Sequence, residues 1–123
     1  MEGLYTELHS KNKIVVIDYS MVPHEKEFDL MKYSLECITK YDKSSALVLE
    51  IIAGVKLNRE ILDYFPGYYE KIKVYVKRWA SVGFGEMIFK EMIASKQIPS
   101  TAKNKNIDWF ETKDEAIQFL LQG

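Results

Sequence analysis

Two short segments hold the residue types best suited to chemistry. Asp18-Tyr19-Ser20 offers a carboxylate and two hydroxyl groups directly after an apolar run, and such groups can orient a small ligand. Gly83-Phe84-Gly85 lies between a predicted strand and a predicted helix, where free backbone N–H groups can receive a phosphate or a carboxylate. The candidate ligand-binding residues are therefore Asp18, Tyr19, Ser20, Gly83, Phe84 and Gly85.

Each segment also has a purely structural interpretation. Gly83-Phe84-Gly85 lacks the third glycine of a dinucleotide fingerprint and the lysine and hydroxyl residue of a P-loop, so we favour a tight turn. Asp and Ser at a strand end commonly cap the following turn, and we favour that role for Asp18 and Ser20. Ligand binding in a crevice at these strand ends is the alternative.

The sequence does not display a catalytic constellation. A nucleophilic Ser20 would need a histidine base held by a carboxylate, but His9 and His24 lie elsewhere and neither has a recognisable carboxylate partner. Cys37 is the single cysteine, so it cannot close an internal disulfide or form a metal cluster with the two distant histidines. We expect no catalytic residue, no metal and no cofactor.

The composition is that of one globular intracellular domain. A chain of 123 residues with 47% hydrophobic residues can bury a core without disulfides or metals. Its 17 basic and 18 acidic residues give a net charge of -1, which does not attract nucleic acid or an anionic membrane. Because the N-terminus has no export signal and no apolar run could span a bilayer, we expect a cytoplasmic protein.

Strands are predicted first by apolar, β-branched runs. Lys13–Tyr19 and Ala46–Ile52 are nearly continuous in apolar residues, which is typical of strands covered on both faces. Trp79–Phe84 and Ile107–Glu111 predict two further strands. Leu4–Leu8 alternates weakly and predicts an antiparallel edge strand.

Helical patterns separate these strands. The apolar spacing within Pro23–Tyr41 predicts an amphipathic helix. Asn58 can cap a second helix, which Pro66-Gly67 should bend or divide in two. A third helix is predicted from Gly85, and the Thr112-x-x-Glu115 capping box begins a fourth.

This alternation predicts a single α/β domain over residues 1–123. Its sheet is expected to be mostly parallel, with four or five strands flanked by about four helices. The carboxyl ends of parallel strands line a crevice. Beside the six candidate residues, that edge of the sheet collects Glu50, Gly54, Glu111 and Thr112.

A tyrosine-rich patch marks the second helix and the segment after it. Its tyrosines are Tyr64, Tyr68, Tyr69 and Tyr75, interleaved with Lys71, Lys73, Lys77 and Arg78. Such spacings allow the rings to be buried with their hydroxyls exposed, so we expect packing at the core and its rim. Among functional interpretations we favour a surface for a protein partner.

Several motifs in one order resemble a known family. They are Ile17-Asp18-Tyr19-Ser20, Tyr75-Val76-Lys77-Arg78, Ala80 to Gly83, and Trp109 to Thr112 with Glu115-Ala116 and Phe119-Leu120. Over roughly residues 13 to 121 the chain resembles the small bacterial STAS-like (SpoIIAA-like) domains, which are related to anti-sigma-factor antagonists. The resemblance implies a largely parallel sheet flanked by helices, in a non-catalytic domain used for signalling or ligand contact.

One family feature is absent from the sequence. The antagonists carry an Asp-Ser-Ser/Thr-Gly turn that a partner kinase phosphorylates, whereas this chain has Ala53-Gly54-Val55-Lys56 after its second buried strand. We therefore expect a non-enzymatic regulatory or protein-interaction module without that phosphosite, acting on an unidentified protein partner. A domain that binds a nucleotide or apolar metabolite is the alternative. A homodimer formed through a strand edge or the tyrosine-rich patch is left open.

Overall fold

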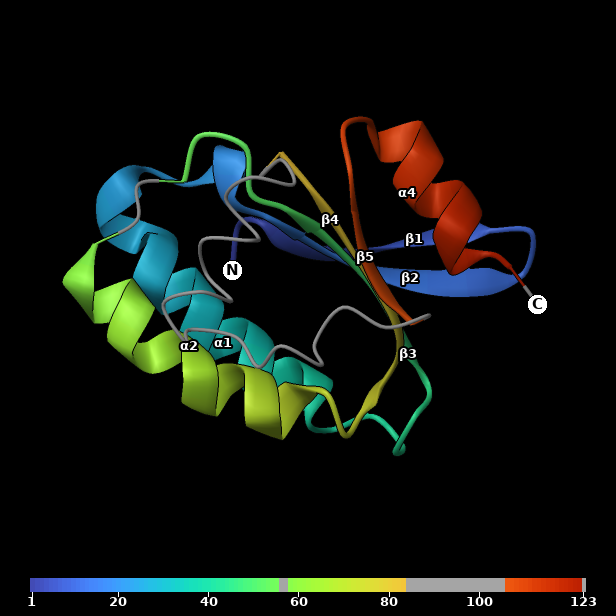
Figure 1. Ribbon diagram of the computed structural model, residues 1–123, viewed down its shortest axis with the longest axis horizontal. Helices are drawn as coiled ribbons and strands as arrows, with labels where there is room; N and C mark the ends of the chain where they lie inside the picture. Colours follow the sequence, from blue (N-terminus) through green and yellow to red (C-terminus); the bar gives the residue numbers. More distant parts are fainter. Residues whose placement is uncertain (56–57, 84–105, 123) are drawn as a thin grey trace.

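A single five-stranded sheet organises the chain, of which the computed structural model describes residues 1–55, 58–83 and 106–122 (Figure 1). The spatial order of the strands equals their order in the sequence. They are β1 (Leu4–His9), β2 (Asn12–Asp18), β3 (Ala46–Ile51), β4 (Val76–Val82) and β5 (Ile107–Phe110). β1 is antiparallel to β2 and all other neighbours are parallel, which confirms the predicted α/β class and the antiparallel edge strand.

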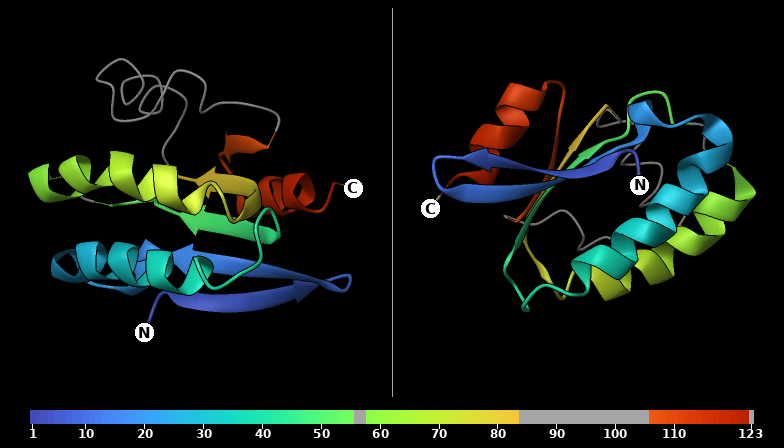
Figure 2. Two further views of the ribbon diagram at one scale, coloured as in Figure 1. Left: turned by 90° about the horizontal axis from the view of Figure 1, so that it is seen from below. Right: turned by 180° about the vertical axis from the view of Figure 1, so that it is seen from behind.

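Helices cover both faces of the sheet. α1 (Glu27–Ile38) and α2 (Arg59–Ile72) lie side by side on one face, and α4 (Lys113–Leu120) lies on the other (Figures 1 and 2). Two 3-10 turns, Tyr19–Met21 and His24–Lys26, lead from β2 into α1. Three of the roughly four predicted α-helices thus fall within the described ranges, and the one predicted from Gly85 lies outside them.

The central strands are apolar on both faces because each face packs against a helical layer. Along β2, Val15 and Ile17 contact the α1 and α2 layer, whereas Ile14 and Val16 contact the α4 layer. All four side chains are almost fully buried. The predicted two-sided burial is therefore confirmed, and its cause is the alternation of side chains along a strand.

A two-residue hairpin joins β1 to β2. His9 pairs with Asn12, and the two loop residues Ser10 and Lys11 have φ angles of 48° and 72°. Positive φ at both positions is the requirement of a type I′ turn, whose twist matches that of the flanking strands. The hairpin fixes the register of β1 along its whole length.

Pro66-Gly67 was expected to bend the second helix or divide it in two, and the division does not occur. α2 runs without interruption from Arg59 to Ile72 with Pro66 inside it. Asn58 caps it as predicted, because its side-chain oxygen accepts a hydrogen bond of 2.8 Å from the Ile61 N–H. Burial of Ile61, Tyr68, Tyr69 and Ile72 favours the helix more strongly than the proline disfavours it, since packing of an apolar face supplies most helix stability in proteins.

β4 differs from prediction in its start, and α4 begins where it was predicted to begin. β4 begins at Val76 and not at Trp79, because Val76 pairs with Ala46 across a local irregularity in the register of β3 and β4. Thr112 caps α4 as predicted, since its hydroxyl oxygen accepts from the Glu115 N–H at 3.3 Å. The Glu115 carboxylate accepts a hydrogen bond of 2.9 Å from the same Thr112 hydroxyl.

Two glycines should respond oppositely to the same substitution. A Cβ at Gly67, inside α2, would contact nothing within 4 Å, so we expect Gly67→Ala to stabilise the protein by about 0.5–1 kcal/mol through helix propensity. Gly83 has a φ of 108°, and its Cβ would lie 2.5 Å from the Ala53 nitrogen. Gly83→Ala should therefore destabilise the protein by about 1 kcal/mol or more. Urea denaturation measures both, and equal effects of the two variants would contradict this account.

Candidate functional site

The turn after β2 uses the polar groups of Asp18 and Ser20 for itself. One Asp18 carboxylate oxygen accepts hydrogen bonds from the Ser20 N–H at 3.0 Å and from the Ser20 hydroxyl at 2.6 Å. This is the capping arrangement that we favoured from the sequence. Within the described ranges the Ser20 hydroxyl thus donates to a carboxylate and not to a histidine, so it is not arranged as an activated nucleophile.

Gly83 directly follows Val82, the last residue of β4. Its positive φ and its close approach to Ala53 explain why a glycine stands there. The other two members of that candidate segment, Phe84 and Gly85, lie outside the described residues. Gly54, after β3, also has a positive φ, and the exposed Glu111 follows β5.

A buried polar cluster lies beneath the carboxyl ends of β2, β3 and β4, on the face covered by α1 and α2. Its central member is Glu50, one residue before the end of β3 and 5% exposed. The Ser81 hydroxyl of β4 donates to the Glu50 carboxylate at 3.3 Å. Buried Tyr19 and Tyr68 complete the cluster, which we call the Glu50 cluster; both lie close enough for the Glu50 charge to affect their pKa values.

Burial is the main cause of the raised pKa values in the Glu50 cluster. Desolvation raises the pKa of Glu50 to about 7, and hydrogen bonds from Ser81 and Trp79 only partly oppose this rise. Desolvation also raises the pKa of Tyr19 and of Tyr68 well above the usual value, with the neighbouring carboxylate adding to the effect. A carboxyl group that titrates near neutrality in a buried polar cluster is a feature of functional sites.

The two phenol groups of the cluster differ in their hydrogen bonding. The Tyr68 hydroxyl lies 3.0 Å from the Ser34 hydroxyl of α1, which itself donates to the Met31 carbonyl at 2.7 Å. The Tyr19 hydroxyl is buried and has no hydrogen-bond partner among the described residues. A buried hydroxyl without a partner costs free energy, so it is a position where a polar ligand atom would be favoured.

Both histidines have carboxylate partners, which corrects the prediction from the sequence. His9 Nε2 lies 3.1 Å from a Glu7 oxygen, and His24 Nδ1 lies 3.0 Å from a Glu27 oxygen. Spacings of two residues along a strand and three along a helix place such pairs on one face, so the sequence did contain this signal. Neither histidine is bonded to Ser20.

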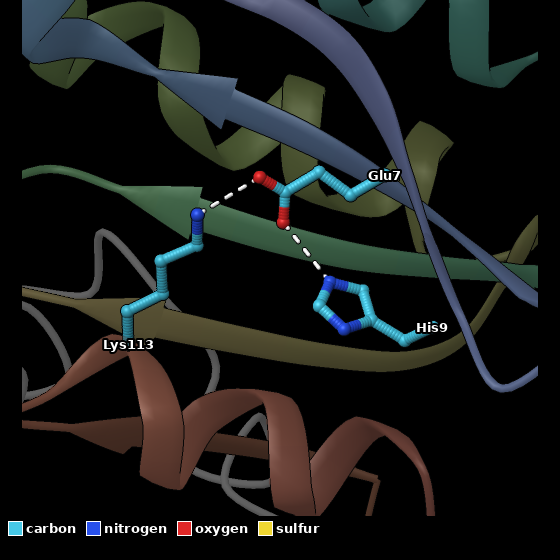
Figure 3. A network of polar contacts seen from close by, with 3 residues as sticks. All are labelled: Glu7, His9 and Lys113. Carbon is cyan, nitrogen blue, oxygen red and sulfur yellow. Dashed lines mark hydrogen bonds and ion pairs between the residues drawn. The ribbon is translucent and has the colours of Figure 1, made fainter.

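Glu7 also joins the two ends of the chain. Figure 3 shows the Lys113 side chain of α4 reaching the Glu7 carboxylate of β1, with a distance of 2.9 Å between nitrogen and oxygen. The hydrogen bond from Lys113, and then that from His9, lowers the pKa of Glu7. The same hydrogen bond to Glu7 raises the pKa of Lys113. The charge of nearby Asp18 also raises the pKa of Lys113, by a smaller amount. The Glu7 charge is therefore compensated within the molecule.

The tyrosine-rich patch is mainly part of the core. Tyr68 and Tyr69 are buried, while Tyr64 and Tyr75 are partly buried and pack against the same hydrophobic cluster. Packing at the core and its rim is therefore confirmed. Tyr68 and Tyr69 are only 1% and 6% exposed, so these two side chains do not offer a surface to a partner.

The side chain of Leu8 is the most exposed of the large hydrophobic residues in the described parts of the chain. It is 75% exposed and belongs to β1, which has a neighbour on one side only in the described sheet. Figure 2 shows β1 as one edge of the sheet, opposite β5. An apolar side chain on an open strand edge is a feature of surfaces that pair with another chain.

Two hollows lie at the other end of the strands. One, of about 330 Å³, is lined by Trp79, Val76 and Ile107 with Lys73 at its rim. A shallower one lies between Lys13 and Tyr41. Within the described ranges, no helix has the length and apolar character to cross a membrane, and no group of three or more His, Cys, Asp or Glu could hold a metal ion.

Comparisons with protein-family models, curated proteins and solved structures give no match to this chain. The STAS-like resemblance consequently rests on the sequence motifs alone and stays a prediction.

The raised pKa of Glu50 predicts a specific dependence of stability on pH. In the folded protein the carboxyl ionises near pH 7, whereas its ordinary value is 4.5. Folding thus favours the protonated form of Glu50. Its contribution to the free energy of unfolding is complete below pH 4.5 and is lost as the pH rises to 7. The loss corresponds to about 3 kcal/mol.

Glu50→Gln cannot titrate, so its stability relative to the wild type should increase by about that amount between pH 4 and pH 8. Urea denaturation at several pH values measures the difference. Glu111→Gln, which removes an exposed carboxylate, is the matched control. A difference between Glu50→Gln and the wild type that does not change with pH would contradict the assigned pKa.

Proposed function

We propose that this chain is a non-enzymatic protein-interaction module that receives a partner strand along the outer edge of β1. The observation that carries the proposal is Leu8, exposed on a strand whose outer side has no neighbour in the described sheet. Addition of a strand to an open sheet edge is a common mode of protein recognition, in which backbone hydrogen bonds give affinity and alternate side chains give specificity.

The β1 edge has few of the features that protect an edge strand from pairing. Such features are charged side chains, above all lysine, and also proline in the strand or a bulge. The β1 sequence, LYTELH, holds neither lysine nor proline, and its six pairs with β2 follow in regular register. Its one carboxylate, Glu7, is paired with Lys113 and His9. These properties favour pairing over protection.

The regulatory part of the proposal comes from the STAS-like resemblance. We propose a bacterial signalling role in the cytoplasm, in which binding is not switched by phosphorylation of the turn after β3. The reason is that Ala53-Gly54-Val55 offers no hydroxyl group there. A chain with one cysteine, Cys37, also suits a reducing compartment.

Small-ligand binding is the second candidate function, and the Tyr19 hydroxyl is the observation that favours it. This group is buried beside Glu50 without a hydrogen-bond partner in the described ranges. A nucleotide or an apolar metabolite with one polar atom would satisfy it. Tyr19→Phe removes the hydroxyl and should leave the free protein as stable or about 1 kcal/mol more stable.

Thermal shift measurements with nucleotides and apolar metabolites test this second function. A ligand at a hundred times its dissociation constant stabilises a protein by about 2.7 kcal/mol, and Tyr19→Phe should reduce that shift. A panel without any shift, or a shift unaffected by Tyr19→Phe, would remove the ligand site at Tyr19.

In-cell photocrosslinking tests the interaction module itself. A photoreactive phenylalanine analogue at position 8 should give a discrete covalent adduct with a protein. The same analogue at Lys71, which is exposed on α2, should give none, because α2 lies away from the β1 edge (Figure 2). Adducts of equal yield at both positions, or none at position 8, would refute an interaction at β1.

A further inference from the structure

The backbone directions along β1 follow from the hairpin. In a two-residue hairpin the closing pair, here His9 and Asn12, exchanges both hydrogen bonds, and bonded pairs then alternate along the ladder. The odd residues of β1 therefore point their backbone groups at β2. The hydrogen bond of 2.6 Å from the Asp18 N–H to the Gly3 carbonyl agrees with this alternation.

The even residues Leu4, Thr6 and Leu8 consequently direct their backbone groups to the outer edge. The Leu4 N–H makes one long contact of 3.4 Å to the Met1 carbonyl. Thr6 and Leu8 have no backbone hydrogen bond on that side within the described residues. Any incoming strand must therefore form its bonded pairs with these three positions.

A second copy of β1 can meet this edge in antiparallel orientation, the isologous arrangement of a two-fold dimer. Bonded pairs must join even residues, which leaves three registers with substantial overlap. A register centred on Tyr5 places Leu8 opposite the charged Glu2. A register centred on Glu7 places that carboxylate opposite its own copy, which is destabilising.

The register centred on Thr6 avoids both conflicts. It pairs Thr6 with Thr6, and each Leu8 with Leu4 of the other copy, so that three bonded pairs form across the axis. The exposed Leu8 side chain then packs on an apolar partner. On the other face of the sheet, Glu7 lies opposite Tyr5, and its charge is already compensated by Lys113.

We infer that the strand received by β1 is β1 of a second copy of this chain, antiparallel and centred on Thr6, so that the described sheets of the two copies become continuous across the two-fold axis. The inference rests on the proposed function and specifies its partner. The LYTELH strand is complementary to a second copy of itself in the register centred on Thr6. In that register Leu8 faces Leu4, and no two carboxylates face each other, which is why we infer a second copy as the partner.

Cysteine crosslinking of the full chain tests the register. Paired Cα atoms in a bonded antiparallel pair lie about 5.5 Å apart, so Thr6→Cys should link two copies through a short bis-maleimide. Leu8→Cys is the matched control: its two copies would lie about 13 Å apart along the strand, although position 8, like position 6, is exposed. Both variants carry Cys37→Ser, so that the native thiol does not react.

Sedimentation equilibrium of the unmodified protein gives an independent measurement, and a doubling of the mass with concentration is expected. Leu8→Lys, which places a charge on the edge, should abolish the doubling while the circular dichroism spectrum is retained. A mass that stays that of one chain, or linkage at position 8 that equals that at position 6, would overturn the inference.

The photoadduct at position 8 separates this failure from failure of the proposed function. An adduct with a different protein, together with a monomeric mass, would overturn self-pairing and retain the interaction module. Absence of any adduct together with a monomeric mass would overturn both. An adduct of two copies of this chain supports both.

Discussion

Burial of the central strands on both faces is the constraint on which the rest of this structure depends. β2 and β3 are apolar at successive positions, so neither face of the sheet tolerates water. The pair α1 and α2 covers one face and α4 covers the other. Because both faces must be covered, the C-terminal helix α4 packs on the face opposite α1 and α2. The edge strand β1 is only partly buried.

The same two-sided burial gives Glu50 its unusual character. The strand that carries it has no solvent-facing side, so a carboxyl group placed there must lie in the core, where the neutral form is favoured. Ser81 and Trp79 donate hydrogen bonds to the Glu50 carboxyl group, and no cation is among the described residues that shift its pKa. The cluster therefore contains a carboxyl group that titrates near neutral pH. It lies at the carboxyl ends of the strands, where ligands most often bind in parallel sheets.

Features that depend on residues close together in the sequence were predicted correctly. Apolar runs located β2 and β3, and the side chains of Asn58 and Thr112 located two helix starts. Asp18 and Ser20 were correctly expected to cap their turn. The division expected at Pro66 does not occur, because tertiary burial of the α2 face outweighs the low helix propensity of proline. The contact of Glu7 with Lys113 joins residues 106 positions apart, so no local pattern could reveal it. Glu50 was recognised as a strand-end residue, but its burial depends on helices that the strand pattern does not specify.

The contact between Glu7 and Lys113 links the fold to the proposed interaction. Charged side chains on an edge strand ordinarily oppose pairing with another chain, and Glu7 would act in that way if it were alone. Lys113 lies at the start of α4, so docking of the C-terminal helix on the sheet brings a cation to the N-terminal strand (Figure 3). Compensation lowers the pKa of Glu7 and keeps the carboxylate directed toward α4. The β1 edge can then present Thr6 and Leu8 to a second strand, and a chain in which α4 had not yet docked would present an uncompensated charge. Docking of α4 is thus a requirement for the full charge compensation of the β1 edge.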